Sequence, residues 1–359
     1  MMAGEVILLF GGPTRERLVS VASAQNVVTQ IDGPCCWFWA PDGAVFEMPS
    51  SELLAHQRPF EVDLVPRDVA RFSDIKKALA SCGGREVFFL ALHGGVAEDG
   101  TLQGWFEERH LAYTGSDARS SRLAFDKDRA REIARGRGLP VAEALTVETN
   151  DLEVARGRIA GLIERHGRVV LKPVADGSSM GLRFLEAADD LDATLLEVRK
   201  EGVAYLAEAF VRGTELTVCV VDDESGVHAL PPSEVRLLAA SGFDYAAKYL
   251  GRGVREITPA EVAPEITAEA QRMALVSHEM LACFGYSRTD LIVTGDASVY
   301  LETNTLPGLT GASFVPQQLA AAGIPLRSFV DRQLTLARRR QQQKAAIEPD
   351  FAHSGSTCV

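Results

Sequence analysis

Two short polar clusters near the end of the chain carry residue types that can bind a metal ion and stabilise negative charge. Arg288-Thr289-Asp290 falls in one predicted strand, Ser287–Val293, and Glu302-Thr303-Asn304 ends the next. Side chains two residues apart on a strand share a face, so a strand pair would gather two carboxylates, an amide and a guanidinium. Such oxygen ligands suit Mg²⁺, which also binds substrate phosphates. Taken alone, a charge ladder on a surface hairpin is an equally good interpretation.

Two glycine-containing segments could contact an anion. Lys172 ends the predicted strand Val169–Pro173 and precedes Asp176-Gly177-Ser178-Ser179-Met180-Gly181. Its ammonium could meet phosphate charge while loop N–H groups meet phosphate oxygens. The segment lacks the Walker A pattern, and an ordinary turn is the more common outcome for such a motif in isolation. Gly308, in Leu306–Ser313, could likewise offer its backbone N–H to an anion or simply form a turn.

Further candidates stand beside turns and strand ends. Glu16 follows the glycine pair after the first predicted strand, where it could bind an ammonium or merely favour a helix dipole. His93 ends a strand, and a lone histidine is more often structural than catalytic. Glu208 and Glu215 flank a turn and could hold ribose or adenine, or lie on the surface. The weakly patterned segment 239–253 predicts a loop that is either disordered or a lid.

The elements that must position these residues indicate an open α/β sheet at the N-terminus. Glu5–Phe10 and Glu86–Leu92 are apolar runs that end in glycines, as buried parallel strands do, and ligands collect at the carboxyl ends of such strands. Residues 119–137 predict one exposed helix, and 204–210 with 216–221 predict a pair of neighbouring strands. From Arg338 onward we expect a fraying helix and a loose tail.

Length and charge narrow the class of protein. A chain of 359 residues suits two or three packed lobes. The net charge of −12 argues against a nucleic-acid partner, and the lack of a long apolar run or an export signal argues against a membrane partner. The six cysteines have neither zinc spacing nor a CxxC pair, so we expect reduced thiols in the cytoplasm.

In their order along the chain, these motifs resemble the D-alanine–D-alanine ligase family within the wider ATP-grasp group. The resemblance spans residues 10–316, and its matching stretches are Phe10-Gly11-Gly12 through Glu16 and Val19-Ser20, Ala91–Gly104, Tyr113–Ser116, Asp126-Lys127, Leu171–Gly181, Gly213–Glu215, Asp244–Tyr249, Arg288–Asp290 and Glu302–Pro316. It implies an N-terminal Rossmann-like α/β substrate-binding domain, then a two-lobed ATP-grasp unit. The expected parts are 1–118, a central lobe 119–207, a C-terminal lobe with the metal site 208–337, and a flexible tail 338–359.

The resemblance also implies a role for each matching residue. The implied ATP ligands are Lys127, Lys172, Glu208 (adenine), Glu215 (ribose) and Lys248 (transferred phosphate). The implied ligands of two Mg²⁺ ions, with Mn²⁺ as an alternative, are Asp290, Glu302 and Asn304. The implied catalytic residues are Glu16, Ser178, Tyr249, Arg288 and Gly308. The implied substrate-binding residues are Val19, His93, Ser313 and Phe314.

The implied reaction joins two D-alanine molecules through an acyl-phosphate, for peptidoglycan precursors, in a cytoplasmic homodimer. The sequence departs from the family pattern at Ala97, where glycine is usual, and at Ala209, where a charged residue is frequent. Phe314 replaces a smaller leucine or methionine and would line the second pocket, whereas Tyr249 is the lid residue of dipeptide-forming members. Two alternatives stay open: a specialised amino-acid ligase with a different second substrate or different substrates altogether, and a nucleotide-binding regulator without catalysis.

Overall fold

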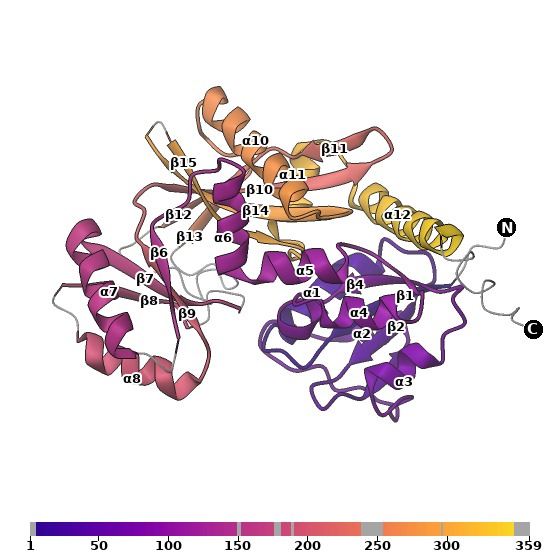
Figure 1. Cartoon of the computed structure of the whole chain (residues 1–359). Coiled ribbons are helices and arrows are strands. Elements are labelled where there is room, and N and C mark those ends of the chain that lie inside the picture. Colours follow the sequence, from indigo (N-terminus) through magenta and orange to yellow (C-terminus); the bar gives the residue numbers. More distant parts are fainter. Residues whose placement is uncertain are drawn as a thin grey trace, which may run out of the picture.

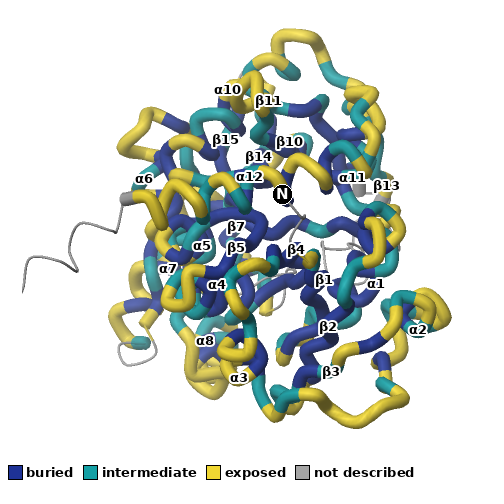
Figure 2. The backbone as a smooth tube through the Cα atoms, turned by 90° about the vertical axis from the view of Figure 1, so that its right-hand side faces the viewer, coloured by how far each residue is buried: buried dark blue, intermediate teal, exposed yellow. Residues whose placement is uncertain are grey.

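In the described part of the chain, three β-sheets follow one another and meet at a common interface (Figure 1). We call this interface the seam, and its charged residues include Lys127, Lys172, Glu208 and Glu302. The computed structural model describes residues 5–148, 152–175, 181–187, 190–237, 254–295 and 297–347. Figure 2 shows that the strands of all three sheets are largely buried, while exposed backbone lies mainly on the outer sides of helices and in loops. The sheets therefore form the frame that positions any residue at the seam.

The N-terminal sheet is mainly parallel, as the apolar runs predict. Its strands are β1 (Val6–Gly11), β2 (Cys35–Trp39), β3 (Val45–Met48), β4 (Val87–Ala91) and β5 (Ala112–Tyr113), in the order β3-β2-β1-β4-β5. The β2–β3 pair is antiparallel and the other pairs are parallel. Its helices are α1 (Arg17–Val28), α2 (Ser50–Ala55), α3 (Ile75–Ala80), the 3₁₀ turn η1 (Gly95–Ala97) and α4 (Thr101–Glu107). The carboxyl ends of β1 and β4 point toward the seam, where Glu16 and His93 follow them.

The central sheet is antiparallel, with one apolar face and one face that mixes apolar and charged side chains. Its strands are β6 (Ala144–Val147), β7 (Arg168–Pro173), β8 (Arg183–Glu186) and β9 (Tyr205–Ala209), in the order β6-β9-β7-β8. The apolar face packs on α7 (Leu152–His166) and α8 (Leu191–Glu201). Because side chains alternate along a strand, Lys172 and Glu208 lie on the opposite face.

The C-terminal sheet carries the two polar clusters. Its strands are β10 (Thr214–Asp223), β11 (Gly226–Ala229), β12 (Ser233–Leu237), β13 (Val254–Ile257), β14 (Tyr286–Thr294) and β15 (Ala297–Asn304), in the order β13-β12-β10-β14-β15 with β11 on β10. One face packs on α6 (Lys127–Gly136) and α10 (Pro264–Met280). The helices α5 (Ala118–Phe125), α11 (Phe314–Ala321) and α12 (Leu326–Ile347) complete the fold.

The single helix expected over residues 119–137 is wrong, because the chain forms two helices there. Asp126 has extended backbone angles between α5 and α6, and its carboxylate accepts a hydrogen bond from the Arg129 N–H at 3.0 Å. A side chain that caps a helix in this way satisfies one of the N–H groups left free at its start. The break aims Lys127, the first residue of α6, at the seam.

The expected pairing of residues 204–210 with 216–221 is also wrong. Both segments are strands, but β9 pairs with β6 and β7, whereas β10 pairs with β11, β12 and β14. The residues between them cross from one sheet to the next. Gly213 lies so close to β14 that an added Cβ would overlap the carbonyl of Val293, so this glycine serves a contact between strands and not a hairpin turn.

The expected tail from Arg338 begins as ordered helix, since α12 continues to Ile347. Arg340 donates two hydrogen bonds of 2.7 Å, to the carbonyls of Tyr113 and Gly115, and its guanidinium lies 4.3 and 4.6 Å from the ring centroids of Tyr113 and Phe284. These contacts fasten the helix to the end of the N-terminal sheet. Residues 348–359 lie outside the described part of the chain.

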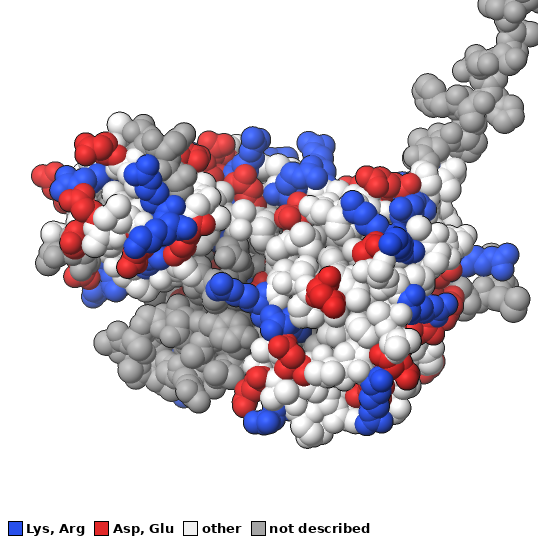
Figure 3. Space-filling model, turned by 90° about the horizontal axis from the view of Figure 1, so that it is seen from below, with Lys and Arg blue, Asp and Glu red and all other residues white. Residues whose placement is uncertain are grey.

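Among the described residues, no helix combines the length and hydrophobicity needed to cross a bilayer. Cys35, Cys36, Cys82, Cys219 and Cys283 are all free thiols. Figure 3 shows basic and acidic side chains of the described residues interspersed on the visible face.

Replacing Arg340 by alanine should lower the free energy of unfolding by about 1–3 kcal/mol, because two carbonyls lose their hydrogen-bond donors. Urea unfolding followed by circular dichroism measures this. Arg339→Ala is the matched control: that side chain is 54% exposed and pairs with Glu224, so its loss should cost at most about 1 kcal/mol. Equal losses in the two variants would contradict an anchoring role for Arg340.

Candidate active site

The two polar clusters of β14 and β15 come together on one face, as the sequence predicts. Asp290 lies opposite Glu302, and Arg288 lies opposite Asn304. Arg288 donates from Nε to Asp290 Oδ1 at 2.9 Å and from Nη2 to Asp290 Oδ2 at 2.7 Å. Asn304 Nδ2 lies 3.4 Å from Asp290 Oδ2, and the Thr217 hydroxyl donates to Asp290 Oδ1. The result is a connected polar cluster.

A β-bulge in β15 makes this arrangement possible. Asp290 pairs with Glu302 but the next residue, Leu291, pairs with Tyr300, so Leu301 has no partner in the register. In a regular strand Tyr300 and Glu302 would share a face. The extra residue instead lets Tyr300 join Leu291 in the core under α10, while Glu302 faces the seam.

The Asp290 carboxylate keeps the buried Arg288 side chain cationic. Burial alone would lower the pKa of its guanidinium, but the adjacent Asp290 carboxylate raises this pKa above the usual value. Beside it, Cys219 lies opposite Arg288 on β10, and burial raises the pKa of that thiol. The site therefore holds a permanent cation and a neutral thiol, which argues against Cys219 as a nucleophile.

Two predicted lysines lie at the seam, each beside a predicted carboxylate. Lys127 Nζ is 3.6 Å from Glu302 Oε2, and Lys172 Nζ is 2.7 Å from Glu208 Oε2. Both lysine side chains are only 12% exposed. The backbone N–H of Lys127 also donates to the carbonyl of Val174 at 3.0 Å, which joins α6 to the end of β7.

Arg131 is a buried member of the same charged group that the sequence reading missed. Its side chain is 3% exposed, and its Nε donates to Glu208 Oε1 at 2.9 Å. It stands four residues after Lys127 on α6, so the two side chains point from one helix face toward the seam. The four-residue spacing from Lys127 could have pointed to Arg131. The sequence analysis instead expected one exposed helix here, on which a charged side chain needs no partner.

Glu16 lies against the start of the loop after β4. Gly94 has φ of +70°, and a Cβ at that position would overlap Glu16 Oε2. Only glycine therefore lets the carboxylate approach the backbone here. Val19, one turn further along α1, is buried in the same region.

His93 connects the N-terminal sheet to the segment that contains Gly308. Its Nδ1 lies 2.9 Å from the Leu306 carbonyl and its Nε2 lies 2.8 Å from Ser23 Oγ. Because a carbonyl only accepts, Nδ1 carries the proton and Nε2 accepts from the Ser23 hydroxyl. Ser23 Oγ in turn accepts from the Leu309 N–H at 3.2 Å. Both sides of Gly308 are thus tied to α1 and β4.

Ser313 and Phe314 stand at the other end of this segment. Ser313 Oγ accepts from the Thr310 N–H at 3.1 Å and lies 2.8 Å from the Thr310 hydroxyl. A Cβ added at Gly308 would lie 2.7 Å from Ser313 Oγ, so the two residues adjoin. Phe314 is buried with its ring centroid 6.0 Å from the Arg288 guanidinium. Gly308, Ser313 and Arg288 therefore belong to one site.

Of the four remaining predicted site residues, one lies on β10 and three lie outside the described part of the chain. Glu215 lies on β10 two residues before Thr217, so it shares the face that carries Asp290. Ser178, Lys248 and Tyr249 lie outside the described residues, together with most of the segment expected to be a loop or lid. Their roles stay predictions.

The residues of the cluster suit a hard divalent cation that also binds phosphate. Among the described residues, no group of three or more His, Cys, Asp or Glu side chains could hold a metal ion. Asp290, Glu302 and Asn304 supply two carboxylates and one amide. Such a small oxygen set fits Mg²⁺, which takes one or two carboxylates and completes its coordination with waters and phosphates.

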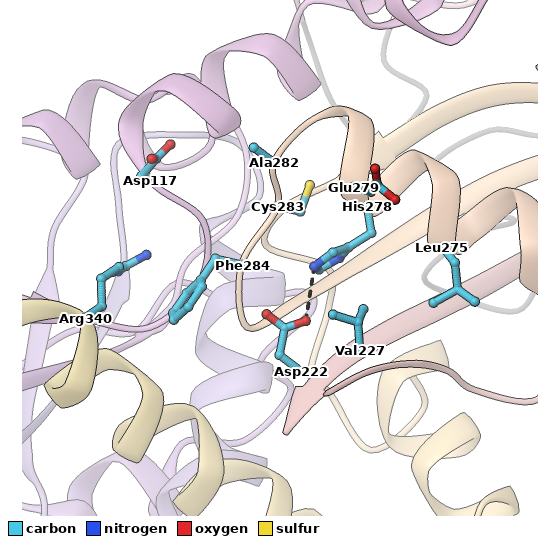
Figure 4. Close-up of a pocket in the computed structure, with 10 residues that line it drawn as sticks. All are labelled: Asp117, Asp222, Val227, Leu275, His278, Glu279, Ala282, Cys283, Phe284 and Arg340. Carbon is cyan, nitrogen blue, oxygen red and sulfur yellow. Dashed lines mark ion pairs between the residues drawn. The ribbon is translucent and has the colours of Figure 1, made fainter. Parts of the chain in front are cut away.

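A separate pocket of about 470 Å³ contains none of the predicted site residues (Figure 4). It lies between α10, the end of β10, the start of α5 and α12. His278 Nε2 is 3.1 Å from Asp222 Oδ1 within it, and Asp222 Oδ2 accepts from the Gly285 N–H at 2.6 Å. His278 Nε2 and Asp222 Oδ1 are thus within ion-pair distance, although neither atom makes a hydrogen bond of regular geometry among the described residues.

Known families and structures match the chain along nearly its whole length. The family model described as "D-ala D-ala ligase N-terminus" matches residues 5–116, and "D-ala D-ala ligase C-terminus" matches residues 133–335. The D-alanine–D-alanine ligase of Leptospira biflexa is 33% identical over 344 residues, covering 90% of this chain and 95% of that protein. The ligase of the same name from Syntrophobacter fumaroxidans is 35% identical over 336 residues, covering 92% and 97%.

Solved structures agree with the fold. The D-alanine–D-alanine ligase of Coxiella burnetii superposes with a TM-score of 0.79 at 24% identity, covering 97% of each chain. The VanG D-Ala:D-Ser ligase of Enterococcus faecalis gives 0.77 at 25% identity, covering 94% of this chain and 100% of that one. These likenesses confirm an N-terminal α/β lobe followed by a two-lobed ATP-grasp unit.

Ser23→Ala should loosen the segment around Gly308 without unfolding the protein. It removes an acceptor from Leu309 and a partner from His93, and one hydrogen bond contributes about 0.5–1.5 kcal/mol, so exchange of the Leu309 amide should accelerate about two- to tenfold. Hydrogen–deuterium exchange of a peptide covering 306–309 measures this. Thr29→Ala, at the exposed end of α1, should leave that exchange unchanged. An equal effect of both variants would show that Ser23 does not hold the Leu309 amide specifically.

Proposed function

The chain belongs to the D-alanine–D-alanine ligase family, and from this we propose that it joins two D-alanine molecules into D-alanyl-D-alanine with ATP as the energy source. The observation that carries the proposal is the seam itself. There the Arg288, Asp290, Glu302 and Asn304 cluster of one sheet faces a group of lysines and glutamates reaching from the neighbouring lobe.

The chemistry must turn a carboxylate into an acceptor for an amine. One carboxylate oxygen of the first D-alanine attacks the γ-phosphorus of ATP, forming an O–P bond as the bond to ADP breaks. The amine of the second D-alanine, after losing a proton, attacks the carbonyl carbon of the resulting acyl-phosphate. The tetrahedral oxyanion then collapses and expels phosphate.

Lys127 and Lys172 supply positive charge for the phosphates. Both side chains are only 12% exposed and both already pair with a carboxylate, so nucleotide binding would exchange one anionic partner for another. Such preorganised charge lowers the barrier more than charge recruited from water, because it needs no reorganisation during the reaction. Lys248, outside the described residues, would add a third cation from the lid. Glu208 and Glu215 would hold adenine and ribose.

Asp290, Glu302 and Asn304 would hold the divalent ion that accompanies ATP, with Mg²⁺ as the preferred ion, two ions as the expected number and Mn²⁺ as an alternative. The ion supplies charge neutralisation at the phosphates. The Arg288 fork on Asp290 holds this carboxylate on the face it shares with Glu302.

The two amino acids would bind on either side of the Gly308 segment. Glu16, lying on Gly94, would take the ammonium of the first D-alanine, with Ser178 and Tyr249 closing the site. Ser313 would bind the carboxylate of the second, and Val19 and His93 would shape the pocket. Arg288, which stays cationic, and the Gly308 N–H would stabilise the oxyanion, while closure excludes water from the acyl-phosphate.

The family context extends the proposal to the cell. The dipeptide would serve as a peptidoglycan precursor made in the cytoplasm, and a homodimer is the expected assembly. The partners are small amino acids and ATP.

A second candidate keeps the chemistry and changes the second substrate. Phe314 packs against Arg288 where a smaller side chain is usual, and the VanG relative is a D-Ala:D-Ser ligase. A bulky ring beside the second pocket would alter its volume. On this reading the chain is an amino-acid ligase of a specialised pathway.

The decisive experiment incubates the protein with ATP, Mg²⁺ and single or paired D- and L-amino acids, and follows phosphate release with products identified by mass spectrometry. D-Alanyl-D-alanine as the main product is the expected result. A mixed dipeptide as the main product would favour the second candidate. ATP binding without turnover for every amino acid would refute both and revive a regulatory role.

Arg288→Ala should lower kcat about 10²–10³-fold, the usual cost of removing one oxyanion donor. It should leave the dissociation constant for ATP within about threefold, since the lysines carry that contact. Steady-state kinetics and calorimetric titration with ATP separate the two. A proportional loss of ATP affinity and rate would contradict the oxyanion role.

A further inference from the structure

Glu208 lies between two cations that approach from opposite sides. Its side chain is 5% exposed, with Lys172 Nζ 2.7 Å from Oε2 and Arg131 Nε 2.9 Å from Oε1. Asp128 Oδ1 lies 3.7 Å from Arg131 Nη1 and makes the local group neutral, with two cations and two carboxylates. The buried Glu208 carboxylate thus contacts two cations, although one cation is enough to balance its charge.

The two cations are held differently. Arg131 stands on α6, is 3% exposed, and also donates from Nη2 to the Ala142 carbonyl at 2.5 Å. Its fork is thus fixed at both ends, as only a guanidinium allows. Lys172 stands on β7, is 12% exposed, and reaches Glu208 with a single ammonium on a flexible stem.

We propose that Arg131 is the fixed counter-ion of Glu208 and a positioning residue for ATP, because it releases Lys172 to bind the nucleotide. When ATP enters, Lys172 turns from Glu208 to phosphate, and Glu208 keeps its charged hydrogen bond to Arg131 Nε. The carboxylate also stays oriented, with Oε2 free to accept from the adenine amine. This inference rests on the proposed function, which makes Lys172 and Glu208 nucleotide ligands.

The free-energy argument concerns the carboxylate that Lys172 leaves behind. A buried charge without a partner is strongly unfavourable, and breaking a buried pair by removing one member costs far more than the pair contributes. Without Arg131, moving Lys172 to phosphate would leave the buried Glu208 carboxylate without a cationic partner. The site would also lose one positive charge close to a polyanion.

Arg131 also joins α6 to the central sheet, and this contact is the competing explanation. The Thr146 hydroxyl on β6 donates to Asp128 Oδ2 at 2.8 Å, beside the Arg131 contacts to Glu208 and Ala142. A purely structural link would affect stability and every kinetic constant together. The charge mechanism predicts a loss confined to ATP, and one that neutralising Glu208 reverses.

The test is a double-mutant cycle of Arg131→Met and Glu208→Gln in the full-length protein. Calorimetric titration with ATP and Mg²⁺ gives affinity, steady-state assays give kcat and the KM for D-alanine, and thermal unfolding reports stability. Arg131→Met should weaken ATP binding at least about tenfold, because Glu208 then competes for Lys172. Adding Glu208→Gln should restore most of that loss, since an amide needs no counter-ion.

Arg129→Met is the matched control on the same helix. That side chain is 70% exposed and lies 3.9 Å from Asp126, so ATP affinity should stay within about twofold of the wild type. The KM for D-alanine in Arg131→Met should also stay within about threefold, since no amino-acid contact is altered.

The outcomes separate this inference from the proposed function. If the wild-type protein neither binds ATP nor makes a dipeptide, the proposed function fails first. If the wild type is active but Glu208→Gln fails to restore ATP affinity to Arg131→Met, the counter-ion role is overturned. A matching fall in kcat, both affinities and thermal stability would likewise overturn it in favour of a structural link.

Discussion

Compensation of buried charge is the constraint on which the seam between the sheets depends. A site for a polyanion must store positive charge before the ligand arrives, and buried cations are stable only beside anions. Arg288 with Asp290, Lys127 with Glu302, and Arg131 and Lys172 with Glu208 all follow this rule. Arg288 holds Asp290 by a two-pronged fork, and Arg131 holds Glu208 while also donating to the Ala142 carbonyl, whereas each lysine reaches its carboxylate with an ammonium on a flexible stem. This division gives the site fixed partners and exchangeable ones.

The fold serves this arrangement by bringing separate sheets to one place. The β-bulge at Leu301 directs Glu302 to the seam while keeping Tyr300 in the core, and Asp126 starts α6 so that Lys127 and Arg131 reach it. From the N-terminal sheet, His93 and Ser23 tie down the segment around Gly308. Each device is local, but the three devices come from different parts of the fold and act at the same place. The lobes therefore depend on one another for the geometry of the site.

The sequence was most informative where partners are close along the chain. The pairing of Arg288–Asp290 with Glu302–Asn304 follows from two adjacent strands and their alternation, and the buried parallel strands follow from apolar runs. It misled where the same local pattern fits two topologies: β9 and β10 are consecutive strands, yet they belong to different sheets. Arg131 was overlooked because a charged residue on a helix is normally exposed, and its burial depends on Glu208, 77 residues away. The helical part of the expected tail depends in the same way on carbonyls near Tyr113. Long-range charge pairing cannot be inferred from local periodicity.

In the proposed site, the contact between Phe314 and Arg288 would link substrate choice to catalysis. Its ring lies 6.0 Å from the Arg288 guanidinium, which also holds Asp290. An aromatic face near a cation is weakly attractive and excludes water from it. A smaller side chain would enlarge the second pocket, but it would also open a path for water to the guanidinium and weaken its field at a developing oxyanion. With the roles proposed for Phe314 and Arg288, selectivity for the second amino acid and the rate of the amine attack would be coupled through this one contact.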